Sequence, residues 1–338
     1  VAELEVLRVD FGAAAQVPGM SITDRVEREP EATFARARRE IPVLNKSGQR
    51  ERPMYQPLGP PDARQEIAVN HDGSIFLHKS ALKSEGADSK RLRWPADAWY
   101  LHLNTGDPSF DPSREGVVKQ RLLAGHLPIV INSWETGGVS YEQTCVATFL
   151  AGEPTAIKGD EMVVLLSRIV MSNVIHTAAQ ASVRLQTEPG EQLAANHGHV
   201  SAKALRGDKG ETYPEPRYRF YFRADGGNAT AKNLSGDSSA TTMAAQWQLA
   251  PGESRTVELR VPFVTLDTAV EREQIAALDF DRVLAVESGR WRKIIAQAAT
   301  FEVPDPLLTD FYKASLAHVL ITGDRDPLSG WSTLSAGT

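Results

Sequence analysis

A group of carboxylates, a guanidinium and an indole lies near the C-terminal end of the sequence. Asp324 and Asp326 flank Arg325 in the segment GDRDP, and Trp331 follows shortly after. Sugar sites use carboxylates to hold pairs of hydroxyl groups and an aromatic ring to cover the apolar face of the sugar. These residue types therefore predict a carbohydrate-binding loop. The alternative interpretation is a solvated turn in which Asp-Pro ends a helix.

A second candidate is the segment NSWETGG, which ends an apolar run and contains Trp134 and Glu135 before two glycines. A loop that reaches the rim of a sugar site would carry such an indole and carboxylate on a flexible connection. An ordinary hairpin connection with a half-buried tryptophan has the same composition. Both interpretations are open at the level of sequence.

Other reactive residue types do not form a recognisable motif. His197 and His199 would share one face of a strand, as two metal ligands must, but no third ligand has a suitable spacing. Cys145, the single cysteine, falls in an alternating strand pattern, which favours a buried structural thiol. The sequence has no G-x-S-x-G, Walker-type or H-E-x-x-H motif. We therefore assign no catalytic residue, metal site or cofactor.

Composition limits the classes of partner. The chain has 338 residues, 41% of them hydrophobic, and a net charge of −6. An acidic balance gives no electrostatic reason to expect nucleic acid or an anionic membrane as a partner. No apolar run approaches the ~20 residues of a membrane-spanning helix. These properties are typical of a soluble protein with one or two domains.

Strand signals dominate the chain up to about residue 265. Short alternating runs are separated by Gly, Pro and Asp turns with no helices between them, which predicts an antiparallel sandwich rather than a βαβ fold. The turn at Asp72-Gly73 predicts one of its hairpins. In RYRFYFRA, period two predicts that Tyr218, Phe220 and Phe222 face inward and that Arg219 faces outward. A further run predicts a shared inward face for Val139, Tyr141, Cys145, Ala147 and Phe149.

Helical signals begin after Leu266. Thr268 and Glu271 have the spacing of a capping box, and Asp305-Pro306 predicts the start of a second, apolar helix. On that last helix Leu308, Phe311, Ser315 and Val319 lie along one face. An isolated helix is marginal in water, so this face needs a partner. We expect the partner to lie downstream, which would make this chain the front part of a longer protein.

The order of these elements resembles the N-terminal part of six-hairpin glycosidases and related phosphorylases. The matching segments are GESRTVELRVPF, GRWRKII, FEVPDPLLTDFYKASL and GDRDPLSGW; the resemblance covers residues 130–338 and is densest over 250–338. It implies a mainly β fold in which a large antiparallel supersandwich, similar to galactose mutarotase, occupies 1–265 with an irregular excursion at 16–61. A helical linker over 266–303 and the first helix of an (α/α)6 barrel over 304–338 would follow.

In that family the sandwich is generally not catalytic and supports the barrel, whose carboxylic acids perform the chemistry. The resemblance thus implies a bacterial, glycoside hydrolase-like protein with carbohydrate and the downstream helical domain as partners, and favours an extracytoplasmic location. Two alternatives are open. The chain could be a stand-alone carbohydrate-binding or scaffolding sandwich, with its terminal helices packed back on the sheet. It could also be a catalytic sandwich of the mutarotase kind, which would need a His/Glu pair in its concave sheet.

Overall fold

In the computed structural model the chain divides into two compact units, Val1–Arg52 and Pro53–Thr338. Of the first unit the structure describes Arg28 alone. Of the second it describes 55–338, apart from residues 64, 71, 79–97, 107–117, 155, 159–160, 189–190, 203–216, 227–229, 234–240, 267, 302, 326–328 and 335–338. The expected excursion at 16–61 therefore lies largely outside the described residues. The strands and helices whose bounds the structure describes all belong to the second unit.

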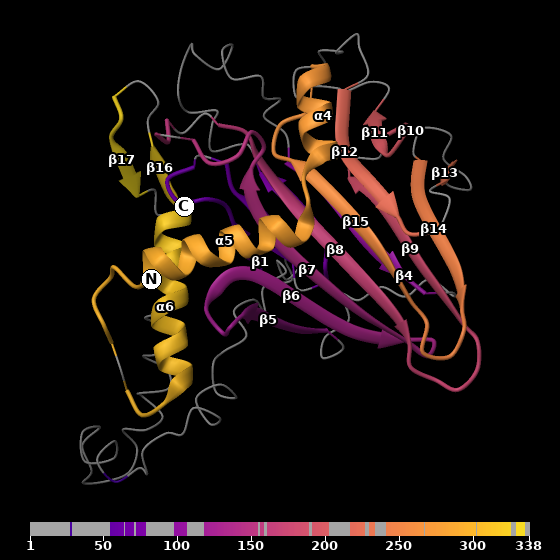
Figure 1. Ribbon diagram of the computed structural model, residues 1–338, viewed down its shortest axis with the longest axis horizontal. Coiled ribbons are helices and arrows are strands. Elements are labelled where there is room, and N and C mark those ends of the chain that lie inside the picture. The colour runs from indigo at the N-terminus through magenta and orange to yellow at the C-terminus, as the bar shows by residue number, and fades with distance from the viewer. Residues whose placement is uncertain are drawn as a thin grey trace, which may run out of the picture. The chain divides into compact units, whose positions relative to one another are not determined.

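The described strands form two large antiparallel sheets (Figure 1). The seven-stranded sheet has the order β1-β2-β3-β4-β9-β14-β13 and the other, eight-stranded sheet the order β10-β11-β12-β15-β8-β7-β6-β5. In the seven-stranded sheet the bounds are β1 Tyr55–Leu58, β2 Ile67–Asn70, β3 Ile75–His78, β4 Ala98–Thr105, β9 Ala179–Glu188, β14 Thr241–Leu249 and β13 Thr230–Asn233. In the eight-stranded sheet they are β10 Leu193–Asn196, β11 His199–Ala202, β12 Arg217–Ala224, β15 Ser254–Pro262, β8 Val163–Asn173, β7 Val139–Phe149, β6 Leu127–Thr136 and β5 Lys119–Leu123.

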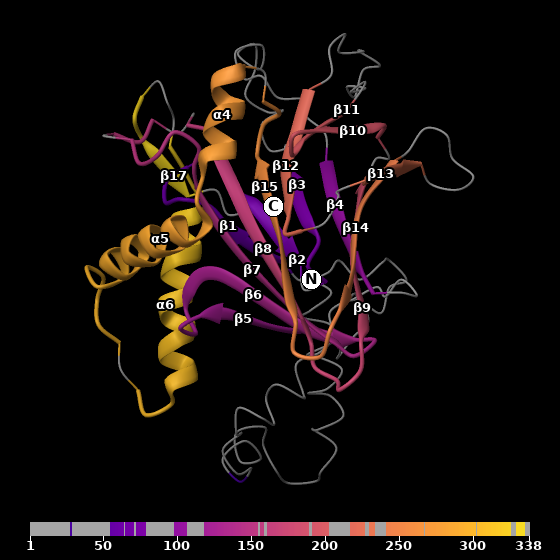
Figure 2. The same ribbon diagram turned by 45° about the vertical axis from the view of Figure 1, so that its right-hand side comes forward.

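Three helices and a small hairpin follow the sheets in the described part of the chain. The helices are α4 (Ala269–Ala277), α5 (Phe280–Ile295) and α6 (Pro306–Ile321). The hairpin pairs β16 (Gly323–Arg325) with β17 (Ser332–Leu334). Figure 2 shows α5 and α6 on the side of the eight-stranded sheet that faces away from the other sheet.

The eight-stranded sheet is covered on both faces, so it belongs to two hydrophobic cores. One core lies between the two sheets, and the other lies between this sheet and the helices. The central strand β8 contributes to both, because Val163 and Leu165 face the first core whereas Val164 and Leu166 face the second. A strand buried on both faces has no solvent-facing side, which explains the apolar run Val163–Leu166 at the start of β8.

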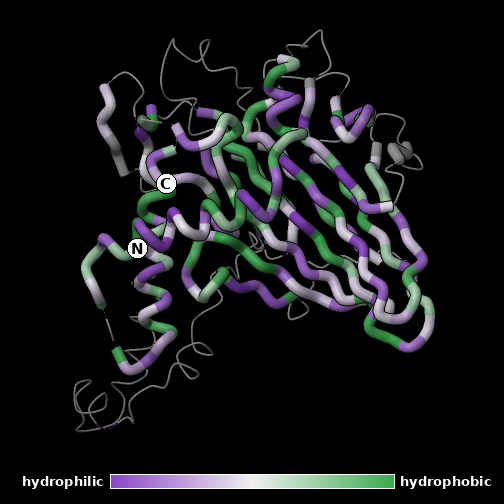
Figure 3. Tube along the Cα trace, viewed as in Figure 1, coloured by the Kyte–Doolittle hydropathy of each residue, from purple (hydrophilic) through white to green (hydrophobic). Residues whose placement is uncertain are grey.

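Several local predictions are confirmed. Strand β7 turns the five residues predicted to share a face into the core between the sheets. The β2–β3 turn contains Gly73 with φ 81°, a conformation that favours glycine, and Asp72 accepts a hydrogen bond from the backbone N–H of Ser74. Figure 3 shows the same alternation of hydrophobic and hydrophilic residues along the strands of the eight-stranded sheet.

The prediction for β12 is wrong at Arg219. Val200 of β11 pairs with Phe220 and Ser201 pairs with Tyr218, so Arg219 is an extra residue without a partner. A β-bulge of this kind changes which face each following side chain takes. Arg219 is therefore buried instead of exposed. Tyr218, predicted to face the inter-sheet core, instead packs against the core below the helices.

The buried guanidinium of Arg219 has partners that compensate for its charge. Its Nη2 lies 2.6 Å from Oε1 of Glu191, and Trp99 Nε1 donates to the other oxygen of that carboxylate at 3.0 Å. The guanidinium also lies over the Trp99 ring. A buried charge is tolerated only when it is paired and hydrogen-bonded, and this group meets both conditions.

The predicted helix starts are confirmed. Thr268 is the N-cap of α4 and forms a capping box with Glu271, and Asp305 is the N-cap of α6 with Pro306 as the first helical residue. Strand β1 differs from the expected irregular excursion, because Tyr55–Leu58 pairs with β2. Pro57 has no N–H to donate to a neighbouring strand, and it is tolerated because β1 lies at the edge of the seven-stranded sheet.

Candidate functional site

Trp134, one of the predicted sugar-binding residues, lies in the core between the sheets. Its side chain is 3% exposed, and its ring stacks on Tyr141 at a centroid distance of 5.6 Å. The indole N–H donates to Thr105 Oγ1 at 3.0 Å, so the polar group of the ring has an internal partner. Trp134 therefore offers no face to a ligand in this structure, and its role here is packing.

Glu135, the next predicted residue, is exposed near the end of β6. The connection to β7 consists of Gly137 and Gly138, both with positive φ, and Val139 begins the next strand. Glu135 pairs in register with Ser140 across this tight hairpin. The segment is thus an ordinary hairpin turn with an exposed carboxylate.

The predicted GDRDP loop is a β-hairpin rather than an irregular loop. Asp324 lies in β16 opposite Thr333 of β17, and Arg325 is half-buried beside it. Asp326 lies outside the described residues. Trp331 is 76% exposed, so its indole is open to solvent. Of the predicted residues, Trp331 has the geometry of a stacking platform.

The structure does not bring these candidates together. The far end of β6, which carries Trp134 and Glu135, lies at the opposite end of the sandwich from the β16–β17 hairpin in both views (Figures 1 and 2). A single sugar site cannot include both groups. We therefore turn from a sugar site to the contacts that attach the described helices to the eight-stranded sheet.

The interior face of the sheets carries amides rather than an acid–base pair. Asn132 Nδ2 donates to Gln143 Oε1 at 3.0 Å, and Gln143 Nε2 donates to Gly73 O at 2.9 Å and to Ser167 Oγ at 3.1 Å. These bonds fasten the β2–β3 turn inside the sandwich. Amides do not titrate near neutral pH, so this cluster cannot perform general acid–base chemistry. A His/Glu pair, the kind that the mutarotase-like alternative needs, lies on the neighbouring strands β4 and β9, where His102 Nε2 is 2.8 Å from Glu188 Oε2.

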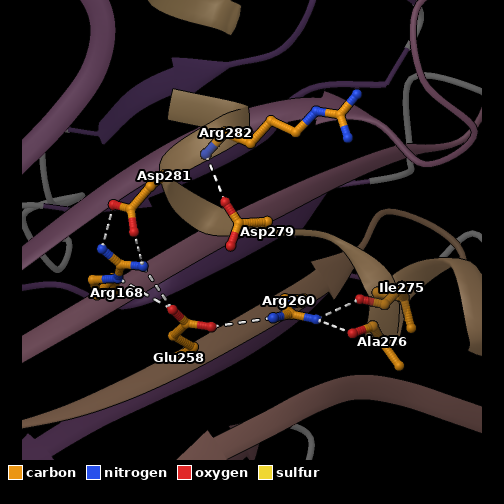
Figure 4. Close-up of polar contacts among 8 residues, drawn as sticks. All are labelled: Arg168, Glu258, Arg260, Ile275, Ala276, Asp279, Asp281 and Arg282. Atoms are coloured by element: carbon orange, nitrogen blue, oxygen red, sulfur yellow. Dashed lines mark hydrogen bonds and ion pairs between the residues drawn. The ribbon is translucent and has the colours of Figure 1, made fainter. Parts of the chain in front are cut away.

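An ionic network attaches α4 and α5 to the outer face of the eight-stranded sheet. We define the helix-docking network as Arg168, Glu258, Arg260 and Asp281 (Figure 4). Glu258 on β15 accepts from Arg168 Nη2 at 2.9 Å through one oxygen and from Arg260 Nη2 at 3.1 Å through the other. The carboxylate thus bridges two arginines of neighbouring strands.

Each arginine of the helix-docking network also holds a helix. Arg260 Nη1 donates to the carbonyl oxygens of Ile275 and Ala276 at 2.8 and 2.7 Å, which satisfies acceptors in the last turn of α4. Arg168 Nη1 donates to Asp281 in the first turn of α5 at 2.6 Å, and this bond lowers the pKa of the Asp281 carboxyl. The network therefore fixes the end of one helix and the start of the next.

A second buried carboxylate lies further along α5. Glu287 is almost fully buried and accepts a hydrogen bond of 2.6 Å from Thr148 Oγ1 of β7. Its other oxygen lies 3.2 Å from Arg290, which also contacts the exposed Glu153 at 3.1 Å. Burial raises the pKa of Glu287, an effect that the Thr148 bond and the Arg290 charge oppose. Together with Trp291, which is buried, Glu287 fixes the middle of α5 on the sheet.

The last helix, α6, buries two alanines and one isoleucine and leaves four other large apolar side chains exposed. Ala314, Ala317 and Ile321 are buried. The side chains left in solvent are Leu307 at 54%, Leu308 at 45%, Phe311 at 71% and Val319 at 47% exposure. We call Leu307, Leu308, Phe311 and Val319 the open face of α6. Exposed apolar residues that recur along one helix in this way indicate an interaction surface.

The remaining candidates have structural roles. His197 has φ 49° in the turn before β11 and His199 packs edge-on against Tyr218, so the two histidines do not share a strand face. No group of three or more His, Cys, Asp or Glu residues in the described part of the chain could hold a metal ion. Burial raises the pKa of Cys145 to about 12. None of the described helices is both long and apolar enough to cross a membrane.

No family model and no curated protein match the sequence. Among solved structures the chain is similar to an inverting mannosidase of family GH92 from Bacteroides thetaiotaomicron, with 9% sequence identity and a TM-score of 0.29. The similarity covers 84% of this chain and 40% of the mannosidase chain, so this chain spans less than half of that protein. At this level the similarity establishes neither a shared fold nor a shared activity.

Sequence reasoning missed the helix-docking network and the burial of Glu287. Arg168 and Glu258 interrupt apolar strands in the sequence, and a charge within an apolar strand is the signal that could have identified them. Their pairing was not visible, because Arg168, Glu258 and Asp281 lie far apart along the chain.

Proposed function

We propose that residues 53–338 form a non-catalytic β-sandwich of a carbohydrate-active, glycoside hydrolase-like protein, and that the sandwich supports a helical domain packed against α6. The observation that carries this proposal is the open face of α6. The carbohydrate assignment rests on the resemblance of residues 250–338 to the six-hairpin proteins.

The way α6 packs supports the proposal. A helix that covered a sheet without any partner would turn its largest apolar residues toward the sheet, because each fully buried Leu, Val or Phe contributes about 1.5–3 kcal/mol. On α6 the buried side carries Ala314, Ala317 and one large residue, Ile321, whereas Phe311 is left in solvent. A second helical layer on the other side would bury these side chains and recover that free energy.

The attachment of α4 and α5 supports a structural role for the rest of the unit. The helix-docking network and Glu287 hold these helices at defined points on the eight-stranded sheet. Surface ion pairs contribute little, but bridged and largely buried ones fix geometry. A rigid platform below α6 is what a buttressing domain requires. In this proposal the chemistry belongs to the helical domain.

The test compares this chain with the natural protein that contains it. Phe311→Ser should leave the melting temperature of this chain unchanged or slightly raised, because the side chain is 71% exposed. In the longer protein the same substitution should lower the melting temperature and the glycosidase activity. Val286→Ser is the matched control, since Val286 is a 50% exposed apolar residue on α5.

Two results would overturn the proposal. One is a natural protein in which Phe311→Ser and Val286→Ser have the same negligible effect, because the open face would then have no partner. The other is hydrolysis of aryl glycosides by this chain alone, which would place the activity in the sandwich. Micromolar glycan binding by this chain without a second domain would instead support the stand-alone carbohydrate-binding alternative.

A further inference from the structure

A cavity of about 270 Å³ lies where the end of α5, the segment 296–301 and α6 meet the turn between β5 and β6. It is distinct from the open face of α6, since none of the four residues of that face lines it. It also contains none of the residues predicted from sequence to bind sugar. Clefts with an apolar wall and a few polar side chains are the usual form of small-molecule sites.

One wall of the cavity is aromatic. Phe301 and Tyr312 lie with ring centroids 5.2 Å apart at an interplanar angle of 46°. The Tyr312 hydroxyl donates to the carbonyl oxygen of Ala299 at 3.0 Å, which ties the connecting segment to α6. Ile295 and Leu316 extend the apolar surface. This wall suits a flat or ring-shaped apolar group.

The charged side chains that line the cavity are all basic. Among the described lining residues they are His126, Arg292 and Lys313, and no Asp or Glu is among these residues. Asp310 lies next to His126, with its Oδ1 3.0 Å from the His126 Nδ1. Neither Arg292 nor Lys313 forms an ion pair with a described residue. Two cationic groups therefore line the cavity, and no described residue supplies a carboxylate that pairs with them.

Backbone acceptors at this end of α5 are already occupied. The carbonyl oxygens of Arg292, Ile294 and Ile295 accept hydrogen bonds from the N–H groups of Ala296, Gln297 and Ala298. The negative end of a helix dipole would otherwise repel an anion. Four carbonyl oxygens at this end of α5, including that of Ala299, are thus engaged by protein donors, which reduces this repulsion.

We propose that this cavity binds a small organic anion that contains a ring. Its carboxylate would lie between Arg292 and Lys313, and its ring would pack on Phe301 and Tyr312. The same chemistry is found in a sugar acid and in an aryl carboxylate, and the experiment separates the two. This inference does not depend on the proposed function, because it requires neither a downstream domain nor catalysis.

The test is isothermal titration of the whole chain at low ionic strength with glucuronate, benzoate and inorganic phosphate. At least one of the two ring-bearing anions should bind, and more tightly than phosphate does. Arg292→Gln and Lys313→Gln should each weaken this binding roughly tenfold or more, since hydrogen bonds to charged groups are the stronger class. Phe301→Leu should weaken it as well, because it keeps an apolar side chain and removes the ring.

Arg282→Gln is the matched control. Arg282 lies on the same helix, at its first turn, and its side chain points away from the helix-docking network (Figure 4). Glucuronate binding above benzoate binding would assign the site to sugar acids, and the reverse order would assign it to aryl acids. The proposal fails if neither anion binds, if phosphate binds as tightly as both, or if Arg282→Gln has the effect of Arg292→Gln.

Discussion

The helix-docking network makes a quantitative prediction for Glu258→Gln. Glu258 is the carboxylate that joins Arg168 to Arg260, and its side chain is 10% exposed. Glutamine has nearly the same shape, so the change removes the negative charge without creating a cavity. Two guanidinium groups would then lie next to a neutral amide in a largely buried position.

Loss of one partner from a buried ion pair costs about 3–5 kcal/mol. Arg168 keeps its bond to Asp281 and Arg260 keeps the carbonyl oxygens of α4, so we expect the lower end of this range, about 3 kcal/mol. Asp281→Asn is the internal comparison, because Asp281 has a side chain that is 72% exposed. Exposed pairs contribute less than about 1 kcal/mol, so this variant should be much less affected.

The free energy of unfolding is measured by urea denaturation, followed by circular dichroism, for the parent and both variants. A loss of about 3 kcal/mol should also lower the melting temperature by roughly 6 °C or more. Hydrogen exchange of the backbone amides shows which elements lose stability. Amides of α4 and α5 should exchange faster in Glu258→Gln, whereas amides of β6 and β7 should change less.

The reasoning is refuted if Glu258→Gln and Asp281→Asn lose the same stability. It is also refuted if Glu258→Gln speeds up exchange across the whole sandwich equally. In either case the carboxylate would not be the residue that attaches the helices to the sheet.

Further predictions concern individual buried groups. Trp291→Ala should cost about 3–5 kcal/mol in urea denaturation, because the indole is 2% exposed beneath α5. Burial raises the pKa of Glu287 above its ordinary value of 4.5, so this group favours folding below that pH and loses the contribution as the pH rises through the folded-state pKa. The free energy of unfolding of Glu287→Gln, relative to that of the parent, should therefore increase as the pH rises from 4 to 8. A difference between the two proteins that does not change with pH would contradict this prediction. Cys145, whose pKa burial raises to about 12, should resist iodoacetamide at pH 8 until the protein is unfolded.

Local structure could be predicted where the alternation of residues along a strand, or the capping residue of a helix, determines it. Alternation over β7 placed Tyr141 and Phe149 inside, because successive side chains of a strand point to opposite faces. The capping residues Thr268 and Asp305 marked helix starts, because their side chains satisfy N–H groups that no helix can satisfy internally. The open face of α6 was also visible as an apolar stripe.

The candidate site could be predicted only in part. The exposure of Trp331 and Glu135 fits the residue types that suggested a sugar site, but their distance apart depends on how the two sheets and the hairpin are arranged. The burial of Trp134 depends on Tyr141 and Thr105, which come from strands β7 and β4. Sequence spacing contains no information on such contacts.

By itself the sequence determined whether a segment forms a strand, a turn or a helix, since strand alternation, glycine turns and helix caps act over a few residues. Tertiary structure decided which face of a strand each side chain takes and which distant residues it contacts. One extra residue in β12 turned Arg219 inward to Glu191, and two neighbouring strands brought Arg168 to Glu258 beneath the helices. These outcomes depend on register and on contacts between distant segments, which form only when the whole unit folds.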